Sequence, residues 1–292
     1  MTAARTRGGY LPGRLTVHSS SAELTSVIRA LRGTGRKVAM VATMGALHEG
    51  HRELIRHARR TPGATVTAVS IFVNPLQFAA GEDLERYPRP LEVDLEMCRE
   101  EGVELVFTPP VDDVHPPGAD TTVSPGALGA QLEGAARPGH FAGVLTVVAK
   151  LFHVVVPDIA FFGEKDYQQL VLIKKMARDL DFPVAVVGVP TVRERDGLAL
   201  SSRNAYLCAD ERARAATLYR ALTAGAAVSA RGPTAVLDAA RAVLAAEPAL
   251  RVEYLELRDP ELGPDPEAGR ARLLVAARSG TTRLIDNIPV QL

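Results

Sequence analysis

KVAMVATMGALHEGH, residues 37–51, joins an apolar run to a segment rich in glycine and histidine. Its first seven residues have the composition of a strand that is buried on both faces of a parallel sheet. A helix that begins near His48 would place His48 and His51 on one face, because side chains three residues apart lie side by side. We therefore expect a buried strand that leads into a helix, with two imidazoles at the junction.

Other apolar, β-branched segments repeat this pattern and alternate with helix-like apolar spacing over residues 50–60, 90–101, 141–155 and 166–180. The strand-like segments are TVTAVSIFV, VELVFTP, DIAFFG and VAVVGVP. Such alternation of strands and helices is typical of a doubly wound α/β fold built on a parallel sheet. The sequence thus predicts a Rossmann-like domain.

The character of the chain changes after VPTVRERDG. Ala- and Arg-rich helical segments at about 209–229 and 233–246 precede the strand-like segments RVEYLELRD, RLLVAARSG and TRLIDN. Helices followed by strands predict a smaller α+β domain. We place the Rossmann-like domain at residues 1–186 and the C-terminal domain at residues 187–292.

Composition argues against several classes of function. The 292 residues contain 34 Lys and Arg against 34 Asp and Glu, so no excess charge favours a nucleic acid or an anionic membrane as a partner. Cys98 and Cys208 form neither a disulfide framework nor a metal-binding motif. There is no secretory signal pattern and no apolar span of 18 residues. We expect a cytoplasmic protein that binds neither nucleic acid nor membranes.

The junction after the first strand predicts a phosphate site. Open α/β sheets bind ligands beyond the carboxyl ends of their strands, where a helix N-terminus offers N–H groups to phosphate. His48 and His51 lie at such a junction, and Gly45 and Gly50 let the backbone approach a ligand closely. In the alternative interpretation, one histidine is a core residue and the other is solvated.

Two further segments, FFGEKDYQQL and DGLALSSRNAYL, carry groups suited to phosphate. Gly163 permits a tight turn after a strand, from which Lys165 can reach phosphates as a compact point charge. Ser201, Ser202 and Arg203 precede a helix, where hydroxyls, N–H groups and a guanidinium can converge on a pyrophosphate. The alternatives are a solvated, self-neutralising turn in the first segment and serines that only cap the helix in the second.

Five segments together are more specific than any one of them. TMGALHEGH, SIFVNPLQF, LEGAARPGHFAGVLTVVAKLF, FFGEKDYQQL and DGLALSSRNAYL, in this order, resemble the pantothenate synthetase (pantoate–β-alanine ligase) family of the nucleotidyltransferase, HIGH-motif superfamily. The resemblance covers about residues 36–288. It implies that ATP, with Mg²⁺, drives the condensation of pantoate with β-alanine through an enzyme-bound pantoyl adenylate, with release of pyrophosphate and AMP. It also implies a homodimer.

The resemblance assigns the ATP side of this chemistry to the three glycine- and serine-containing segments, with His51 as proton donor and Asp166 beside the ribose or adenine. The implied catalytic residues are His48, His51, Lys165, Ser201, Ser202 and Arg203. The implied ATP-binding residues are Met44, Gly45, Ala46, Leu47, His48, Glu49, Gly50, His51, Gly163, Glu164, Lys165, Asp166, Val192, Leu200, Ser201, Ser202 and Arg203.

The resemblance also assigns pantoate to Gln77 and Gln169, with Gln77 touching β-alanine as well, and it matches Asp94 to a carboxylate near Mg²⁺. Asn74 and Arg137 are further candidates for contact with pantoate or β-alanine. Neutral amides such as Gln77 and Gln169 bind a carboxylate without quenching its nucleophilicity. Three alternatives stay open at this point. Asn74 can form an Asx turn, Arg137 can order its loop, and Asp94 can be a solvated residue of an amphipathic helix.

Two other functions compete with this interpretation. A nucleotidyltransferase of the same superfamily would act on a phosphorylated substrate and would not need Gln77 or Gln169. A non-catalytic nucleotide-binding module would tolerate loss of His51, Lys165 or Arg203, yet all three are present. Since water destroys an acyl adenylate, we also expect the C-terminal domain to close over the nucleotide about a hinge near residues 189–196.

Overall fold

The computed structural model describes residues 10–63, 65–79, 81–264 and 266–292. The chain forms two compact units: Met1–Gly163 with Leu172–Val189, and Glu164–Val171 with Pro190–Leu292. The second unit thus begins close to the expected boundary at residue 187, but it also includes the eight-residue segment after the fifth strand. Closure of the C-terminal domain stays a prediction.

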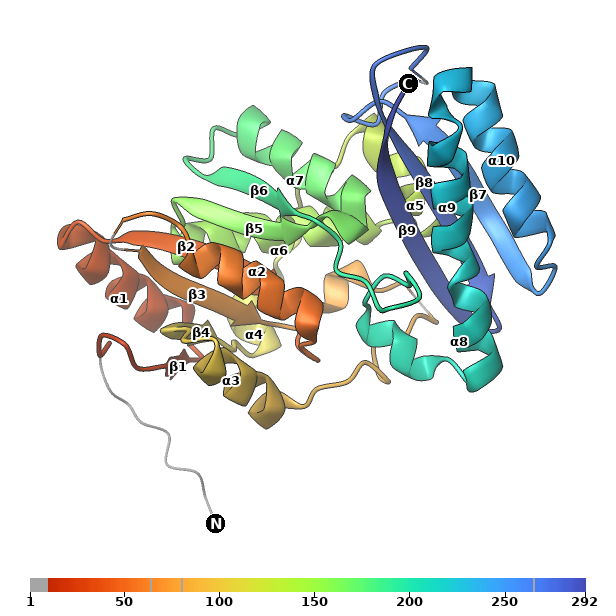
Figure 1. Ribbon diagram of the computed structural model, residues 1–292. Helices are drawn as coiled ribbons and strands as arrows, with labels where there is room; N and C mark the ends of the chain where they lie inside the picture. Colours follow the sequence, from red (N-terminus) through yellow and green to blue (C-terminus); the bar gives the residue numbers. More distant parts are fainter. Residues whose placement is uncertain (1–9, 64, 80, 265) are drawn as a thin grey trace. The chain divides into compact units, whose positions relative to one another are not determined.

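The first unit contains, in the described part of the chain, a parallel sheet in the order β1-β4-β3-β2-β5-β6 (Figure 1). Its strands are β1 (Thr16–His18), β2 (Lys37–Thr43), β3 (Thr65–Ile71), β4 (Leu105–Phe107), β5 (Ile159–Gly163) and β6 (Ala185–Val189). From β2 the chain proceeds outward through β3 to β4, whereas β5 and β6 lie on the other side of β2. The strand order therefore reverses between β2 and β5, which is the switch point where such sheets bind ligands.

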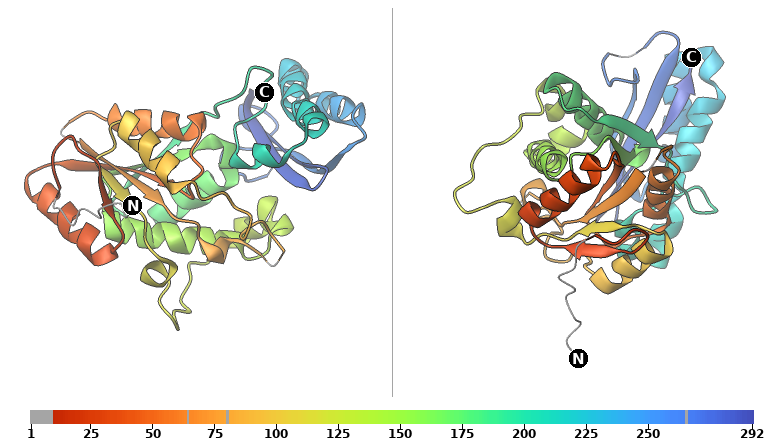
Figure 2. Two further views of the ribbon diagram at one scale, coloured as in Figure 1. Left: turned by 90° about the horizontal axis from the view of Figure 1, so that it is seen from below. Right: turned by 90° about the vertical axis from the view of Figure 1, so that its left-hand side faces the viewer.

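Helices cover both faces of this sheet, with α1 and α6 together on one face and α2 on the other (Figure 2). The helices that begin in the first unit are α1 (Ser21–Gly33), α2 (Glu49–Arg59), α3 (Leu91–Glu100), α4 (Val111–Val114), α5 (Glu133–Ala136) and α6 (His140–Val155), with 3-10 turns η1 (Pro75–Gln77) and η2 (Ala127–Ala130). Helix α7 (Tyr167–Asp179) follows the 3-10 turn η3 (Glu164–Asp166) and runs from the second unit into the first.

The core of the first unit explains the apolar run in β2. Val38, Ala39, Met40 and Val41 are all fully buried. Because successive side chains of a strand point to opposite faces, β2 is covered on both sides, as a doubly wound sheet requires. Ala39 and Val41 pack in one cluster with residues of α2 and α3.

The second unit has an antiparallel sheet, β7-β8-β9, in the residues that the structure describes. Its strands are β7 (Leu250–Arg258), β8 (Arg270–Ser279) and β9 (Thr282–Gln291), and its helices are α8 (Ala209–Ala215), α9 (Thr217–Ala227) and α10 (Pro233–Ala245), with 3-10 turns η4 (Ser202–Tyr206) and η5 (Ser229–Arg231). Leu222 of α9, Val236 of α10 and Leu273 of β8 share one buried core. Gly225 permits close packing, since a Cβ there would lie 2.8 Å from the Val236 carbonyl oxygen.

The predicted fold class, a doubly wound parallel sheet with a smaller C-terminal α+β part, is confirmed. No helix among the described residues has both the length and the apolar character needed to cross a membrane. Both cysteines are free thiols, Cys98 buried in α3 and Cys208 exposed. Burial raises the pKa of the Cys98 thiol to about 12.

Candidate active site

The loop after β2 is shaped by two consecutive residues in the left-handed region, Gly45 (φ 84°) and Ala46 (φ 50°). A Cβ on Gly45 would lie 2.9 Å from Asp94 Oδ2 and 3.1 Å from the Ile71 side chain, so glycine is required by contact as well as by conformation. Thr43 begins the turn, since its hydroxyl donates to the Ser70 carbonyl and accepts from the Gly45 amide.

Asp94 of α3 holds this loop from beneath. Its Oδ2 accepts from the Ala46 amide at 2.9 Å and its Oδ1 accepts from the Leu47 amide at 2.7 Å. The residue is 1% exposed. Burial raises the pKa of the Asp94 carboxyl, an effect that these two N–H groups oppose. Asp94 is therefore a buried support of the loop, and the alternative of a solvated helix residue is wrong.

The surroundings of Asp94 do not fit a metal site built from protein ligands. No group of three or more His, Cys, Asp or Glu residues that could hold a metal occurs in the described ranges. Both carboxylate oxygens of Asp94 also accept from backbone N–H groups. The arrangement supplies no protein cage for Mg²⁺, which usually keeps several waters and binds through substrate phosphates.

His48 and His51 begin α2 in a reciprocal cap. His48 Nδ1 accepts from the Gly50 amide at 3.1 Å, and His51 Nδ1 accepts from the His48 amide at 3.2 Å. The two ring centroids lie 4.1 Å apart, as the spacing of three residues predicts. Since an imidazole nitrogen that accepts carries no proton, the neutral form of each ring has its proton on Nε2. Each ring is thus a hydrogen-bond donor through Nε2.

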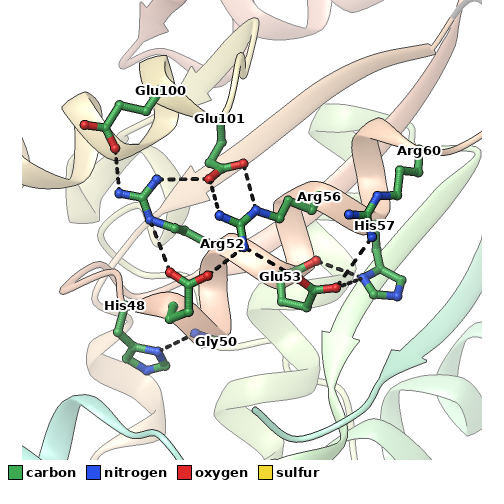
Figure 3. Close-up of polar contacts among 10 residues, drawn as sticks. His48, Gly50, Arg52, Glu53, Arg56, His57, Arg60, Glu100 and Glu101 are labelled. Atoms are coloured by element: carbon green, nitrogen blue, oxygen red, sulfur yellow. Dashed lines mark hydrogen bonds and ion pairs between the residues drawn. The ribbon is translucent and has the colours of Figure 1, made fainter. Parts of the chain in front are cut away.

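The polar face of α2 is bound to the C-terminal end of α3 (Figure 3). Arg52 and Arg56 both donate to Glu101, at 2.9 Å each. Arg56 also pairs with Glu49 at 2.6 Å, so the Glu49 side chain belongs to this ion-pair network. Burial favours a higher pKa for the Glu101 carboxyl, but the hydrogen bonds from Arg56 and Arg52 outweigh it and hold that pKa below its usual value. Helix α3 therefore contacts both the loop before α2 and the helix itself.

Gln77 and Asn74 lie in the turn after β3. Gln77 Nε2 donates to the Met44 sulfur, which brings together a residue predicted for pantoate and one predicted for ATP. Asn74 Oδ1 accepts from the Leu76 amide at 3.3 Å, the Asx-type contact that its sequence suggested, and is 2.8 Å from His115 Nε2. Asn74 Nδ2 donates to the carbonyl of Gly143 in α6 at 3.1 Å.

Arg137 binds the same turn. Its Nε and one terminal nitrogen donate to the two oxygens of Glu82 at 2.7 and 2.6 Å, and that terminal nitrogen also donates to the Gln77 carbonyl at 3.2 Å. His140 Nδ1 lies 2.8 Å from the same carbonyl. These are the contacts of a loop-ordering arginine. Burial favours a higher pKa for Glu82, but Arg137 outweighs it and holds that pKa below its usual value.

In the second unit, η3 carries the last three residues of the GEKD sequence, Glu164, Lys165 and Asp166. Lys165 Nζ lies 3.7 Å from Asp166 Oδ1, and the carbonyls of Glu164 and Lys165 accept from Asn287 Nδ2 at 3.0 and 2.9 Å. Gly163 is the last residue of β5, and Gln169 lies in the first turn of α7 beside the buried Gln168. The predicted turn after the fifth strand is therefore present, with its backbone fixed by β9.

The serine-rich segment of the second unit follows a short hairpin. The Leu200 amide donates to the Val192 carbonyl at 3.0 Å, which places these two predicted ATP residues opposite each other. Ser201 caps the turn η4, because its hydroxyl accepts from the Arg203 amide at 3.3 Å. The capping alternative for this serine is thus realised, and its hydroxyl hydrogen can still be donated to a ligand. Ser202 and Arg203 are the first two residues of η4.

Sequence reasoning did not find four polar residues that hold these segments. His115 and Glu82 support the turn that contains Gln77, and Arg272 and Asn287 support the GEKD segment. Burial, together with Lys150, lowers the pKa of His115. One signal was available for Asn287, which with Asp286 interrupts a strand-like segment with polar residues.

The fold and the site together define a class of protein. A doubly wound sheet with a histidine-bearing helix N-terminus at its switch point is the arrangement of a nucleotide-binding α/β enzyme. Residues 16–289 match the family model described as pantoate-beta-alanine ligase. The pantothenate synthetase of Nocardia farcinica is 63% identical over 286 residues, which cover 98% of this chain and 89% of that protein. That of Saccharopolyspora erythraea is 62% identical, over 97% of this chain and 94% of its own length.

Solved structures agree with these relatives. The crystal structure of pantothenate synthetase from Thermus thermophilus matches with a TM-score of 0.86 and 49% identity, over 93% of this chain and 98% of that one. The pantoate-beta-alanine ligase of Francisella tularensis, crystallised with "Beta-gamma ATP" and β-alanine, matches with a TM-score of 0.79 and 32% identity, over 94% and 97%. The chain belongs to the pantoate–β-alanine ligase family. Members of this family condense pantoate with β-alanine in an ATP-dependent reaction, and this protein is such a ligase.

Proposed function

We propose that the protein makes pantothenate in two steps with ATP as co-substrate. In the first step the pantoate carboxylate attacks the α-phosphorus, the bond to the bridging oxygen breaks, and pyrophosphate leaves with its electron pair. In the second step the β-alanine amine attacks the acyl carbon of pantoyl adenylate, AMP leaves, and the amine loses a proton. The observation that supports this proposal most directly is the pair of histidine rings at the N-terminus of α2.

The proposed binding of the ATP phosphates rests on hydrogen-bond donors and positive charges. Nε2–H groups of His48 and His51 would donate to the phosphoryl oxygens, on which negative charge grows as pyrophosphate leaves. Each ring is held in this tautomer by a backbone N–H on its Nδ1. We assign His51 as the proton donor. Lys165 and Arg203 would add positive charge, and the hydroxyls of Ser201 and Ser202 would add donors.

The pantoate side rests on neutral amides. We assign Gln77 and Gln169 to the pantoate carboxylate and hydroxyls, because a neutral donor leaves the carboxylate nucleophilic. Gln77 is buried and fixed by contacts to both its side chain and its carbonyl. Asn74 binds the Leu76 amide of this turn and the Gly143 carbonyl of α6, and Arg137 binds the Gln77 carbonyl and Glu82. We therefore assign both of them to the support of Gln77 and not to direct substrate contact.

Mg²⁺ enters this proposal as part of MgATP, where it neutralises phosphate charge when bound. We assign Asp94 to the support of the loop, because each of its oxygens accepts from a backbone N–H group there. A homodimer and a cytoplasmic location remain predictions from the sequence.

The test is AMP release by the purified protein with MgATP and pantoate, with and without β-alanine. We expect multiple turnovers only when both substrates are present. His51→Ala and Lys165→Ala should each lower kcat by at least about 100-fold. His153→Ala is the matched control, since His153 is an exposed histidine of α6. Wild-type turnover by His51→Ala, or turnover that does not depend on pantoate, would contradict the proposal.

A further inference from the structure

Two buried polar side chains of the C-terminal sheet, Arg272 and Asn287, have no role in the chemistry proposed so far. Arg272 in β8 is 5% exposed and Asn287 in β9 is 3% exposed. Burial of an arginine and an asparagine is costly unless each polar atom finds a partner. Their partners show what they are for.

The amide of Asn287 is directed at the segment that contains Lys165. Its Nδ2 donates to the Glu164 carbonyl at 3.0 Å and to the Lys165 carbonyl at 2.9 Å, which uses both of its hydrogens. Its Oδ1 accepts from Arg272 Nε at 2.6 Å. Only this orientation of the amide gives every atom a partner of the right kind. The carbonyls of the two peptide groups that flank the Lys165 Cα are thus held by one side chain.

Arg272 binds side chains of the same segment. Its guanidinium donates to Glu164 Oε2 at 2.8 Å and lies 4.0 Å from the centroid of the Tyr167 ring, a cation–π contact. The Tyr167 hydroxyl in turn donates to the Pro260 carbonyl at 3.0 Å. Residues on both sides of Lys165 are therefore bound to the C-terminal sheet and to the chain that follows β7.

The side chain of Lys165 contributes little to holding this residue in place. Its ammonium lies 3.7 Å from Asp166, which is longer than a hydrogen bond. A lysine has four rotatable bonds, so its reach is set by where the main chain places its Cα. The position of the ammonium thus depends on the backbone that Asn287 and Arg272 fix.

We propose that Asn287 and Arg272 are positioning residues for Lys165. They bind the segment after β5 to the C-terminal sheet, so that the backbone of Lys165 is held by the second unit. This inference rests on the proposed role of Lys165 on the ATP phosphates. The proposal gives neither side chain a contact with substrate. Their loss should act on catalysis through Lys165 and through no other group.

A double-mutant cycle tests this dependence. Asn287→Asp keeps the shape and the acceptor for Arg272, but it replaces the donor with an oxygen that faces two carbonyls. We expect kcat/KM for ATP, followed as AMP release with pantoate and β-alanine both present, to fall by about 10- to 100-fold. In a Lys165→Ala background the same change should cost less than about 2-fold, because the group it positions is already gone.

Ser279→Ala is the matched control. Ser279 is fully buried in β8 and donates to the Glu211 carbonyl, so its loss removes a hydrogen bond from the same sheet without touching residues 164–171. It should lower the melting temperature and leave kcat/KM for ATP unchanged. If Asn287→Asp fails to fold, Glu164→Gln replaces it, because the Glu164 side chain is partly exposed. We expect Glu164→Gln to lower kcat/KM for ATP by a smaller factor, and this loss should also disappear in the Lys165→Ala background.

The possible outcomes separate the two proposals. If the losses in Asn287→Asp and Lys165→Ala multiply, or if folded Asn287→Asp keeps the wild-type kcat/KM, the positioning role is wrong while the ligase assignment stands. If the wild type releases no AMP with pantoate, β-alanine and ATP, the proposed function itself fails. If Lys165→Ala matches the wild type, its assignment to the phosphates fails.

Discussion

The loop after β2 and the segment after β5 both carry residues that we assign to ATP, but they are held in different ways. The first is held by the cap that His48 and His51 form directly after it, and by Asp94, which lies 48 positions after Ala46. The second is held by Asn287, 122 positions after Lys165. The residues that we assign to the ligand lie in recognisable motifs in both places. The residues that support them do not, and the comparison can be tested by removing supports one at a time.

Loss of Asp94 should have the largest effect on the first loop. Asp94→Ala removes the acceptor of the part-buried Ala46 amide and of the buried Leu47 amide, and loss of the partner of a buried N–H costs about 1–3 kcal/mol. We expect the free energy of unfolding to fall by about 3 kcal/mol and kcat/KM for ATP to fall about 100-fold. Urea unfolding and steady-state kinetics measure both. Asp94→Asn keeps one acceptor oxygen and should be intermediate, and unchanged kinetics in Asp94→Ala would show that the loop does not need this support.

Gly45→Ala should have the next largest effect. The added Cβ meets both an unfavourable backbone conformation and Asp94 Oδ2 at 2.9 Å, and we expect a loss of about 2 kcal/mol in unfolding free energy. Gly35 is the matched control, because it has a similar φ of 82° but nothing within 4 Å of its added Cβ. Gly35→Ala should cost only about 1 kcal/mol. Equal losses in thermal or urea unfolding would mean that contact with Asp94 is unimportant.

Glu82→Gln should have a smaller effect that depends on pH. Arg137 holds the folded-state pKa of Glu82 below its ordinary value of 4.5, so the ionised carboxylate stabilises the fold above that pH. This stability is lost as pH falls through the folded-state pKa. We expect Glu82→Gln to lower the unfolding free energy by about 1 kcal/mol at pH 7 and by progressively less toward pH 3. Glu96→Gln, which breaks an exposed pair with Arg99, is the control, and a constant difference across this range would contradict the prediction.

The ion pairs between α2 and α3 should give the smallest effects. Glu101 is 13% exposed and binds two arginines, whereas Glu100 is 51% exposed and binds one. We expect Glu101→Gln to cost about 1 kcal/mol and Glu100→Gln about 0.5 kcal/mol or less, because solvent screens an exposed pair. Raising the salt concentration should shrink the effect of Glu100→Gln further, which unfolding experiments in low and high salt can measure. The reverse order would mean that burial does not govern this network.

Local signals explain why much of the fold could be predicted. The apolar run at residues 37–43 is β2, and the glycine and histidine segment leads into α2 at Glu49. Helices expected at 90–101, 141–155 and 166–180 are α3, α6 and α7 within a few residues. These elements carry their periodicity and caps in adjacent residues. Strand β1 and helix α1 were not predicted, and β1 has only three residues, too few to show a period.

The supports of the site could not be predicted in the same way. Glu82 faces Arg137, 55 positions away, and His115 faces Asn74, 41 positions away, so no spacing in the sequence links the partners. Their contacts exist only after the strands and α6 are assembled. Asp94 was expected on an amphipathic helix, and nothing local shows that its carboxylate is buried under a loop. Recognition of motifs locates the groups that we assign to a ligand, whereas long-range packing determines how firmly those groups are held.

The attachment of the Lys165 segment to Asn287 also has a consequence for synthesis on the ribosome. The two residues are 122 positions apart, and translation adds about 5–20 residues per second. The lysine therefore exists for about 6–24 s before the side chain that fixes its backbone has been made. The sheet of the first unit can assemble during this interval, because all six of its described strands precede residue 190. The backbone of Lys165 can thus reach its final position only after nearly the whole chain has been made.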